Sequence, residues 1–156
     1  GRTMFYVAND GKTGTELHSV SLATLGASNL ENYGTGCAGS AGNVPDMSGI
    51  GVPSLGNAKF TLRLGNAKTG APCVLLAGAA KSKLPLGNGC TLLVMPIISV
   101  PSVTSKSGDA KWTLPVPNNN YLMTASIYFT GAAIDAGGKA FGVAAIANGL
   151  EMIVGL

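Results

Sequence analysis

Short apolar runs that end at glycine or proline are the feature that most limits how this chain can fold. Cys73–Ala77 and Cys90–Val94 are two such runs, each flanked by a glycine on one side and a proline on the other. Inside a helix each glycine would cost about 1 kcal/mol and each proline about 3 kcal/mol, so helices of ordinary length do not fit between the breaks. Strands of about four to eight residues do fit, and runs without polar residues are typical of strands buried on both faces.

Other segments alternate apolar and polar residues, which is the pattern of a strand with one face in water. Glycine makes up 23 of the 156 residues and only 11% of the residues are charged, compared with about 25% in an average soluble domain, which disfavours long charged helices. We therefore predict an all-β chain, an antiparallel β-sandwich or jelly roll with an N-terminal β-hairpin extension. The expected strands are residues 3–8, 16–22, 60–64, 73–77, 90–94, 111–116, 126–130, 141–147 and 150–154.

The chain divides into three parts by composition. Residues 1–22 contain two apolar stretches around the turn-rich segment Asn9–Gly14, which predicts a β-hairpin. Residues 23–51 are rich in Gly, Ser, Asn and Ala, and we expect a linker or an extended segment there. Residues 52–156 should form the sandwich, with a hairpin turn at Asn148-Gly149 near its end.

The polar residues do not form a catalytic or metal-binding pattern. His18 is the single histidine, whereas a zinc site needs three or four ligands, and the seven acidic residues are dispersed. Gly34–Gly39 has the G-x-G-x-x-G spacing of a dinucleotide-binding loop, but that motif needs a buried strand before it and a helix after it, whereas residues 40–45 (SAGNVP) follow here. We predict that the chain is not an enzyme and holds no cofactor or metal.

Charge and hydropathy exclude two further classes. The net charge of +3 comes from ten basic residues spread along the chain without a cluster, whereas nucleic-acid binding needs a basic patch. The longest uncharged run, residues 84–105, contains three prolines and two glycines, so it cannot be a transmembrane helix. We predict no nucleic-acid partner and no transmembrane segment.

The three cysteines allow one disulfide in an oxidising compartment. A Cys37–Cys90 bond would close a long loop and attach the Gly-rich segment to the sandwich. Cys73 lies within an apolar run, which favours a buried free thiol there. A Cys73–Cys90 bond between adjacent strands stays open as the alternative.

Two stretches resemble known families. Phe5–Leu17 (FYVANDGKTGTEL) resembles the secreted propeller-type repeats with a Gly-x-Glu-Leu-Trp pattern, although His18 stands in place of the Trp. Residues 33–155 contain, in order, YGTGCAGSAG, PSLGNAKFTLRL, GAPCVLLAG, PLGNGCTLLV and NGLEMIVG. This series resembles the C-terminal β-sandwich domain of large secreted proteins of planctomycete-like bacteria. The resemblance implies a non-catalytic, extracellular module and favours the pair Cys37–Cys90, because these two cysteines lie in the family's Cys-bearing motifs.

Self-assembly is the function that we predict. The strand Met4, Phe5, Tyr6, Val7 and Ala8 is apolar, a two-stranded hairpin is marginally stable alone, and the following segment could deliver it to a neighbouring subunit. Such strand donation would give a homo-oligomer or a polymer, as in an extracellular fibre or surface layer. The competing expectation is that the hairpin folds back onto its own sandwich.

The alternative function is a carbohydrate-binding or cell-surface-binding module of a larger secreted protein. A polysaccharide partner would need exposed aromatic side chains, and the candidates are Tyr6, Tyr33, Tyr121, Tyr128 and Trp112. Trp112 alternates with Leu114, which favours a core position for its side chain.

Overall fold

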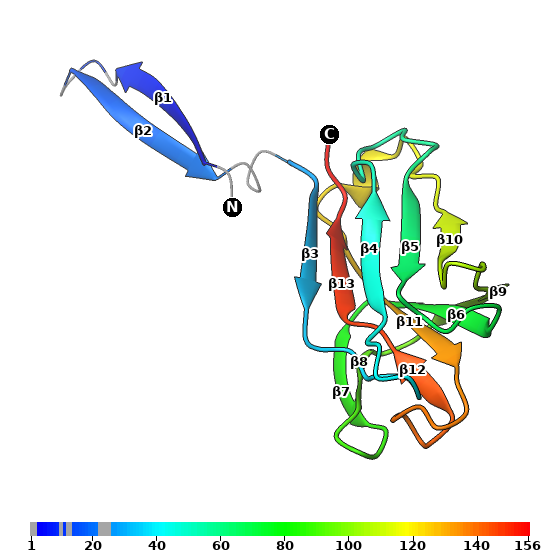
Figure 1. The fold of residues 1–156 in the computed structure, drawn as a ribbon. Coiled ribbons are helices and arrows are strands. Elements are labelled where there is room, and N and C mark those ends of the chain that lie inside the picture. The colour runs from blue at the N-terminus through cyan, green and yellow to red at the C-terminus, as the bar shows by residue number, and fades with distance from the viewer. Residues whose placement is uncertain (1–2, 10, 12–13, 22–25) are drawn as a thin grey trace.

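The computed structural model describes residues 3–9, 11, 14–21 and 26–156, and the regular structure there consists of strands and one 3-10 turn, η1 (Asn120–Leu122). Figure 1 shows the hairpin of the first two strands standing away from a compact sandwich. The strands are β1 (Thr3–Asn9), β2 (Thr15–Ser21), β3 (Asn29–Tyr33), β4 (Asp46–Ile50), β5 (Thr61–Gly65), β6 (Pro72–Gly78), β7 (Lys81–Pro85), β8 (Thr91–Val94), β9 (Ile98–Val103), β10 (Ala110–Thr113), β11 (Ser126–Ile134), β12 (Ala144–Ile146) and β13 (Gly149–Ile153).

Two antiparallel sheets form the sandwich. The larger sheet has the strand order β3-β13-β11-β6-β9, with β12 also paired to β11, and the smaller sheet has the order β10-β5-β4. The predicted all-β sandwich with an N-terminal hairpin extension is confirmed. The strands expected from the apolar runs, β6 and β8, form as predicted.

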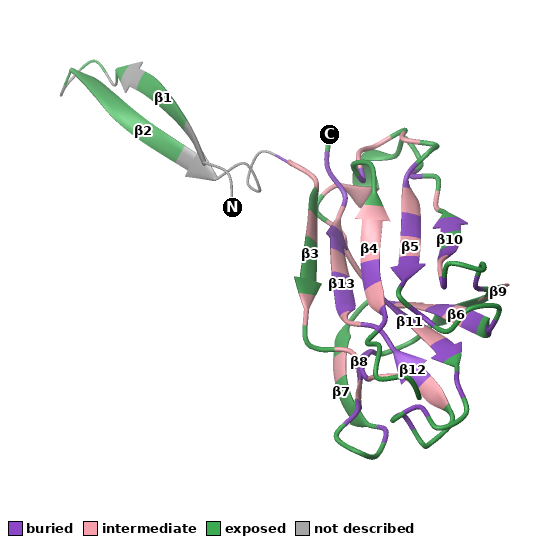
Figure 2. Cartoon of the chain, viewed as in Figure 1, coloured by how far each residue is buried: buried purple, intermediate pink, exposed green. Residues whose placement is uncertain are grey.

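The main core lies between these two sheets. The alternation around Phe60–Leu64 and Trp112 places the larger apolar side chains inside, as predicted, and Figure 2 shows the buried residues along β5, β10 and β13. Gly131 of β11 allows the sheets to approach closely, because a Cβ there would lie 2.7 Å from Leu64 Cδ1. The largest core side chains are Met47, Phe60, Leu62, Leu64, Leu75, Trp112, Phe129, Leu150 and Met152.

A second, smaller core lies on the opposite face of the larger sheet. The β7–β8 hairpin covers it, and the Cys37–Cys90 disulfide, with a Cα–Cα distance of 5.6 Å, lies within it. Leu86, Leu92 and Ile146 pack around the disulfide. The predicted pair Cys37–Cys90 is confirmed, and Cys73 is a buried free thiol in the main core rather than a partner of Cys90.

The expected hairpin turn at Asn148-Gly149 is wrong. Strands β12 and β13 do not pair with each other, because both pair with β11, one after the other along the same edge. Asn148 lies at the irregularity between them and reaches the smaller sheet, where its side-chain oxygen accepts a hydrogen bond of 2.8 Å from the Met47 amide. Gly149 lies opposite Tyr33 of β3, and its missing side chain leaves room for the tyrosine ring.

Residues 23–51, for which the sequence left a linker or an extended segment open, contribute two strands in their described part. β3 pairs with β13 at the edge of the larger sheet, and β4 pairs with β5 in the smaller sheet. The Leu156 amide donates a hydrogen bond of 2.8 Å to the Gly26 carbonyl, which attaches the start of this part to the end of the chain. Residues 22–25 lie outside the described residues.

Candidate assembly interface

The N-terminal hairpin carries the residues that the sequence singled out for assembly. β1 and β2 pair antiparallel over seven residues each, with Phe5 opposite Ser19 and Val7 opposite Leu17. Beyond Asn9, the Asn9 side chain accepts a hydrogen bond of 2.8 Å from the Gly11 amide, an Asx-type turn of the kind that Asn favours. Residues 10, 12 and 13 of this connection lie outside the described residues.

One face of the hairpin carries three exposed apolar side chains, with Ser19 opposite Phe5. Phe5, Val7 and Leu17 share this face, because directly opposed residues and every second residue point to the same side of a sheet. Their exposed fractions are 65%, 64% and 71%, and Figure 2 shows the described part of the hairpin as exposed throughout. The face therefore presents apolar surface without a cover among the described residues.

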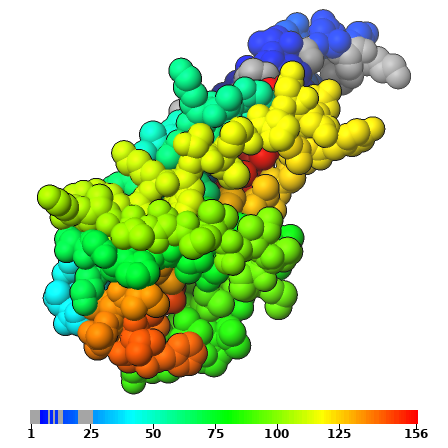
Figure 3. Space-filling view, turned by 90° about the vertical axis from the view of Figure 1, so that its right-hand side faces the viewer, coloured from blue at the N-terminus to red at the C-terminus, as the bar shows by residue number. Residues whose placement is uncertain are grey.

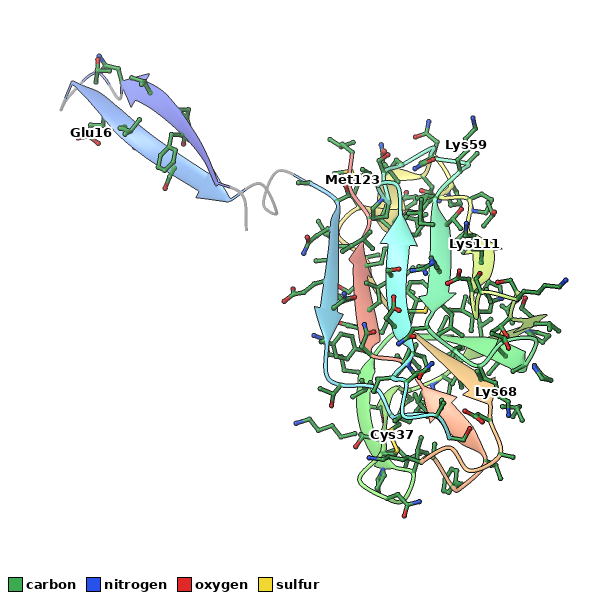
Figure 4. The ribbon with its side chains drawn as sticks, in the orientation of Figure 1. Glu16, Cys37, Lys59, Lys68, Lys111 and Met123 are labelled. Atoms are coloured by element: carbon green, nitrogen blue, oxygen red, sulfur yellow. A yellow bond between two sulfur atoms is a disulfide. The ribbon has the colours of Figure 1, made fainter. Side chains whose placement is uncertain are left out.

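The other face of the hairpin is more polar. The rings of Tyr6 and His18 stack with their centroids 5.4 Å apart, and Glu16 Oε2 lies 3.8 Å from His18 Nε2. Figure 4 shows Glu16 far from the sandwich. Met4 and Ala8 belong to β1 by their backbone, but their side chains lie outside those that the structure describes.

The described residues of the hairpin pair only with each other. β1 and β2 form a separate two-stranded sheet, and neither is hydrogen-bonded to a strand of the sandwich. A two-stranded sheet of this kind is at best marginally stable in water. The described part of the hairpin presents apolar side chains to solvent, and its pair of ionisable groups, Glu16 and His18, is exposed on the other face.

The aromatic candidates for carbohydrate binding do not share one surface. Trp112 is buried in the main core, and Tyr6 stacks on His18 in the hairpin. Tyr33 and Tyr128 meet edge to face beneath a lysine side chain. Tyr121, in the 3-10 turn η1, is 95% exposed and stands apart from the other aromatic residues.

Tyr33 and Tyr128 form a closed polar cluster on the outer face of the larger sheet, which the sequence did not reveal. Lys81 Nζ lies 4.5 Å from the centroid of the Tyr33 ring and 2.8 Å from Glu151 Oε2, and the Tyr128 hydroxyl donates to Glu151 at 3.1 Å. Burial, reinforced by Tyr128 and Glu151, raises the pKa of Tyr33 to about 12. The Lys81 hydrogen bond lowers the pKa of Glu151, so the cluster acts as an ion pair that attaches β7 to β13.

A second polar cluster surrounds Asp135, which is 4% exposed. The Asp135 carboxylate accepts hydrogen bonds from the Ser40 hydroxyl at 2.7 Å, the Ser40 amide at 2.8 Å and Lys68 Nζ at 3.1 Å. These donors, Ser40 first, lower the pKa of Asp135, so the group is a poor base at neutral pH. A hollow of about 240 Å³ borders the cluster, and Figure 4 shows Lys68 at this end of the sandwich.

These clusters come from residues far apart in the chain, such as Ser40 and Asp135, and no sequence signal links them. Among the described residues, no three His, Cys, Asp or Glu side chains gather as metal ligands, and no helix there is long and apolar enough to cross a membrane. Burial raises the pKa of the Cys73 thiol, although a hydrogen bond with Ser102 acts in the opposite direction. A thiol with a raised pKa is a weak nucleophile.

The fold and its surfaces define a disulfide-linked antiparallel β-sandwich with a projecting apolar hairpin. No family model, curated protein or solved structure matches the chain. The resemblances to the propeller-type repeats and to the planctomycete-type C-terminal domain therefore stay predictions.

Proposed function

We propose that the chain is a non-catalytic structural subunit that assembles with copies of itself through its N-terminal hairpin, in an extracellular fibre or surface layer. The observation that carries this proposal is the face formed by Phe5, Val7 and Leu17, which is about two-thirds exposed on a two-stranded sheet that pairs with no other described strand. Burial of one such side chain stabilises a contact by about 1.5–3 kcal/mol, so association with a neighbour offsets the marginal stability of the hairpin.

The disulfide supports the extracellular part of the proposal. Structural disulfides persist in oxidising compartments and are rare in reducing ones. The Cys37–Cys90 bond lies inside the second core, where both cysteines are at most 6% exposed. This burial fits a structural bond rather than one exchanged during a redox reaction.

The test replaces apolar side chains of the hairpin in the full chain. The variant Phe5→Ser/Leu17→Ser should raise the concentration needed for assembly at least tenfold, measured by sedimentation velocity and electron microscopy. The matched control is Val52→Ser/Leu84→Ser, which changes two residues of the sandwich with exposed fractions of 56% and 55% and should assemble like the wild type. A wild-type chain that stays monomeric at all concentrations, or a hairpin variant that assembles normally, would refute the proposal.

The alternative, a carbohydrate-binding or cell-surface-binding module, has one observation in its favour. The exposed Tyr121 ring follows three exposed asparagines, Asn118, Asn119 and Asn120, and an aromatic face beside amide groups can stack on a sugar ring and hydrogen-bond its hydroxyls. Binding of the chain to an insoluble polysaccharide that is lost in Tyr121→Ala and kept in Phe5→Ser/Leu17→Ser would favour this alternative.

A further inference from the structure

A second largely exposed apolar surface lies on the larger sheet, at the side where β9 forms the edge and next to the second core, against which Ala132 packs. Ala132, Val74 and Pro101 stand directly opposite one another on β11, β6 and β9. Pro72 and Val103 form the next row, which Ile134 continues on β11. We call these six residues the outer patch, and none of them is charged.

The register shows which way the outer patch faces. Ala133 and Cys73 pair with each other and are buried in the main core. Their chain neighbours point to the opposite face because side chains alternate along a strand. Ile134 is 56% exposed and Val103 is 62% exposed.

The edge strand β9 is apolar on its other face as well. Ile98 and Val100 stand opposite the core residues Ala77 and Leu75, yet they are 59% and 39% exposed. Figure 3 shows β9, in yellow-green, lying open across this side of the molecule above the orange residues that follow β11. A strand with apolar side chains on both faces is typical of one that is buried on both faces, so this side has the composition of an interface.

The backbone of β9 disfavours pairing with a further strand along its edge. The Thr104 amide donates to the Ala71 carbonyl, so the backbone of Thr104 faces β6. Backbone N–H and C=O groups alternate in direction along a strand, so those of Ser99, Pro101 and Val103 point away from β6, toward the free edge. Pro101 has no N–H to donate in the middle of this edge, and proline is a common block to edge pairing. The apolar side chains, rather than a continued ladder of hydrogen bonds, are therefore what this side offers to a partner.

We infer that the outer patch receives the Phe5–Val7–Leu17 face of the hairpin of a second copy of this chain. The inference rests on the proposed function and names the surface that receives the hairpin. Both surfaces are apolar and uncharged, and both measure about 7 Å along the strands and one or two strand spacings of about 4.8 Å across.

The hairpin precedes the end of the larger sheet that lies opposite the outer patch. The chain enters the sheet at Asn29, which stands opposite Ile153, and Ile153 stands opposite Ser126 at the start of β11. The outer patch lies around Ile134, at the other end of β11, about 27 Å away along the strand. A contact between different surfaces at opposite ends is head-to-tail, and it produces filaments when it does not close into a ring.

The small size of the two surfaces predicts a reversible contact. A stable pair of proteins buries about 800 Å² of accessible surface on each partner. Three side chains on one partner and six on the other bury less than this. Assembly should therefore depend steeply on concentration.

The test uses full chains in which one of the two surfaces is disabled. Val103→Glu and, separately, Ile134→Glu place a charge on the outer patch and should raise the concentration for assembly at least tenfold. Val52→Glu is the matched control, because Val52 is 56% exposed and lies outside the patch. All three changes are at exposed positions, and unchanged far-UV circular dichroism would verify the fold.

Mixing separates failure of this inference from failure of the proposed function. Val103→Glu keeps its hairpin and Phe5→Ser/Leu17→Ser keeps its patch, so an equimolar mixture should form a 1:1 heterodimer that does not grow. Hairpin-dependent assembly of the wild type that persists in both patch variants would overturn the inference and leave the proposed function intact. If the wild type is a monomer and its hairpin resists protease, and if the hairpin becomes sensitive to protease in the patch variants, the hairpin docks on its own chain. That result would overturn both the inference and the proposed function.

Discussion

Removal of the Cys37–Cys90 disulfide should lower the free energy of unfolding by about 4 kcal/mol. The bond joins residues 53 positions apart, and the entropy that such a loop takes from the unfolded chain corresponds to about 4 kcal/mol at room temperature. The change to make is Cys37→Ala/Cys90→Ala, because a single substitution would leave an unpaired thiol in the second core.

The effect should be largest around β7 and β8. These strands form a two-stranded sheet of their own. Besides the disulfide, the hairpin is attached by the Lys81–Glu151 ion pair and by three hydrogen bonds, from the Phe141 amide to the Leu86 carbonyl, from the Tyr33 hydroxyl to the Leu93 carbonyl and from the Asn88 side chain to the Lys139 carbonyl. Without the disulfide, amide hydrogen exchange should accelerate in β7 and β8 more than in β11, because a unit with few remaining links opens locally.

Urea unfolding followed by circular dichroism measures the loss. Cys73→Ala is the control, because it removes a buried sulfur from the main core while keeping the disulfide, and it should cost about 1 kcal/mol. A loss below 1 kcal/mol in the double variant, with an unchanged urea slope, would refute the assignment of the disulfide as the main link of the second core.

Two further predictions concern ionisable groups. Asp135→Asn should lower the free energy of unfolding by about 2 kcal/mol at neutral pH. Because the pKa of Asp135 is lowered in the folded chain, the wild type keeps this stabilisation above the unfolded pKa of about 3.9 and loses it as the pH falls further. The free energies of unfolding of the wild type and the variant, measured with urea, should therefore converge in acid. Tyr33 has a folded pKa of about 12, so its contribution to the free energy of unfolding is present below the unfolded pKa of about 10 and is lost as the pH rises to about 12. An absorbance titration should show one phenol that ionises near pH 12 and is missing in Tyr33→Phe. A wild type without this step would contradict the burial of the Tyr33 ring.

The strands that were predicted from sequence are those whose side chains alone specify a buried strand. β6 and β8 are continuous apolar runs, and β5 alternates regularly. β4 (DMSGI) was missed because its two large apolar residues, Met47 and Ile50, do not alternate, and β7 (KSKLP) was missed because Leu84 is its one large apolar residue. β9 was missed because Pro101 indicates the end of a strand in the sequence. The strand forms because β9 lies at the edge of the sheet, where proline is tolerated.

The error at Asn148-Gly149 has a similar cause. An Asn-Gly pair between apolar runs is a strong hairpin signal, but β11 offers nine residues of edge, enough to pair with β12 and β13 one after the other. Asn148 then hydrogen-bonds Met47 in the other sheet, and Gly149 makes room for the Tyr33 ring. Local preference was overridden by tertiary contacts that lie about 100 residues away in the chain.

The hairpin face was accessible from the sequence, because the register of two strands joined by a short turn follows from their alternation. The outer patch was not accessible, because it depends on the order of β11, β6 and β9 across the sheet. The apolar residues of β9 were visible, but the sequence gives no means of telling a buried strand from an exposed one.

The sparse charge of the chain is unevenly distributed, and this distribution supports the proposed assembly. Lys81–Glu151, Lys68–Asp135 and Arg63, which binds Asp46 and Asp109, use seven of the seventeen charged residues in ion pairs within the sandwich. The outer patch and the Phe5–Val7–Leu17 face contain none. A monomer gains nothing from two uncharged apolar surfaces, since exposed apolar patches favour aggregation. A subunit that buries one of these surfaces against the other needs both to lack charges, because an unpaired charge in the contact would lose its hydration.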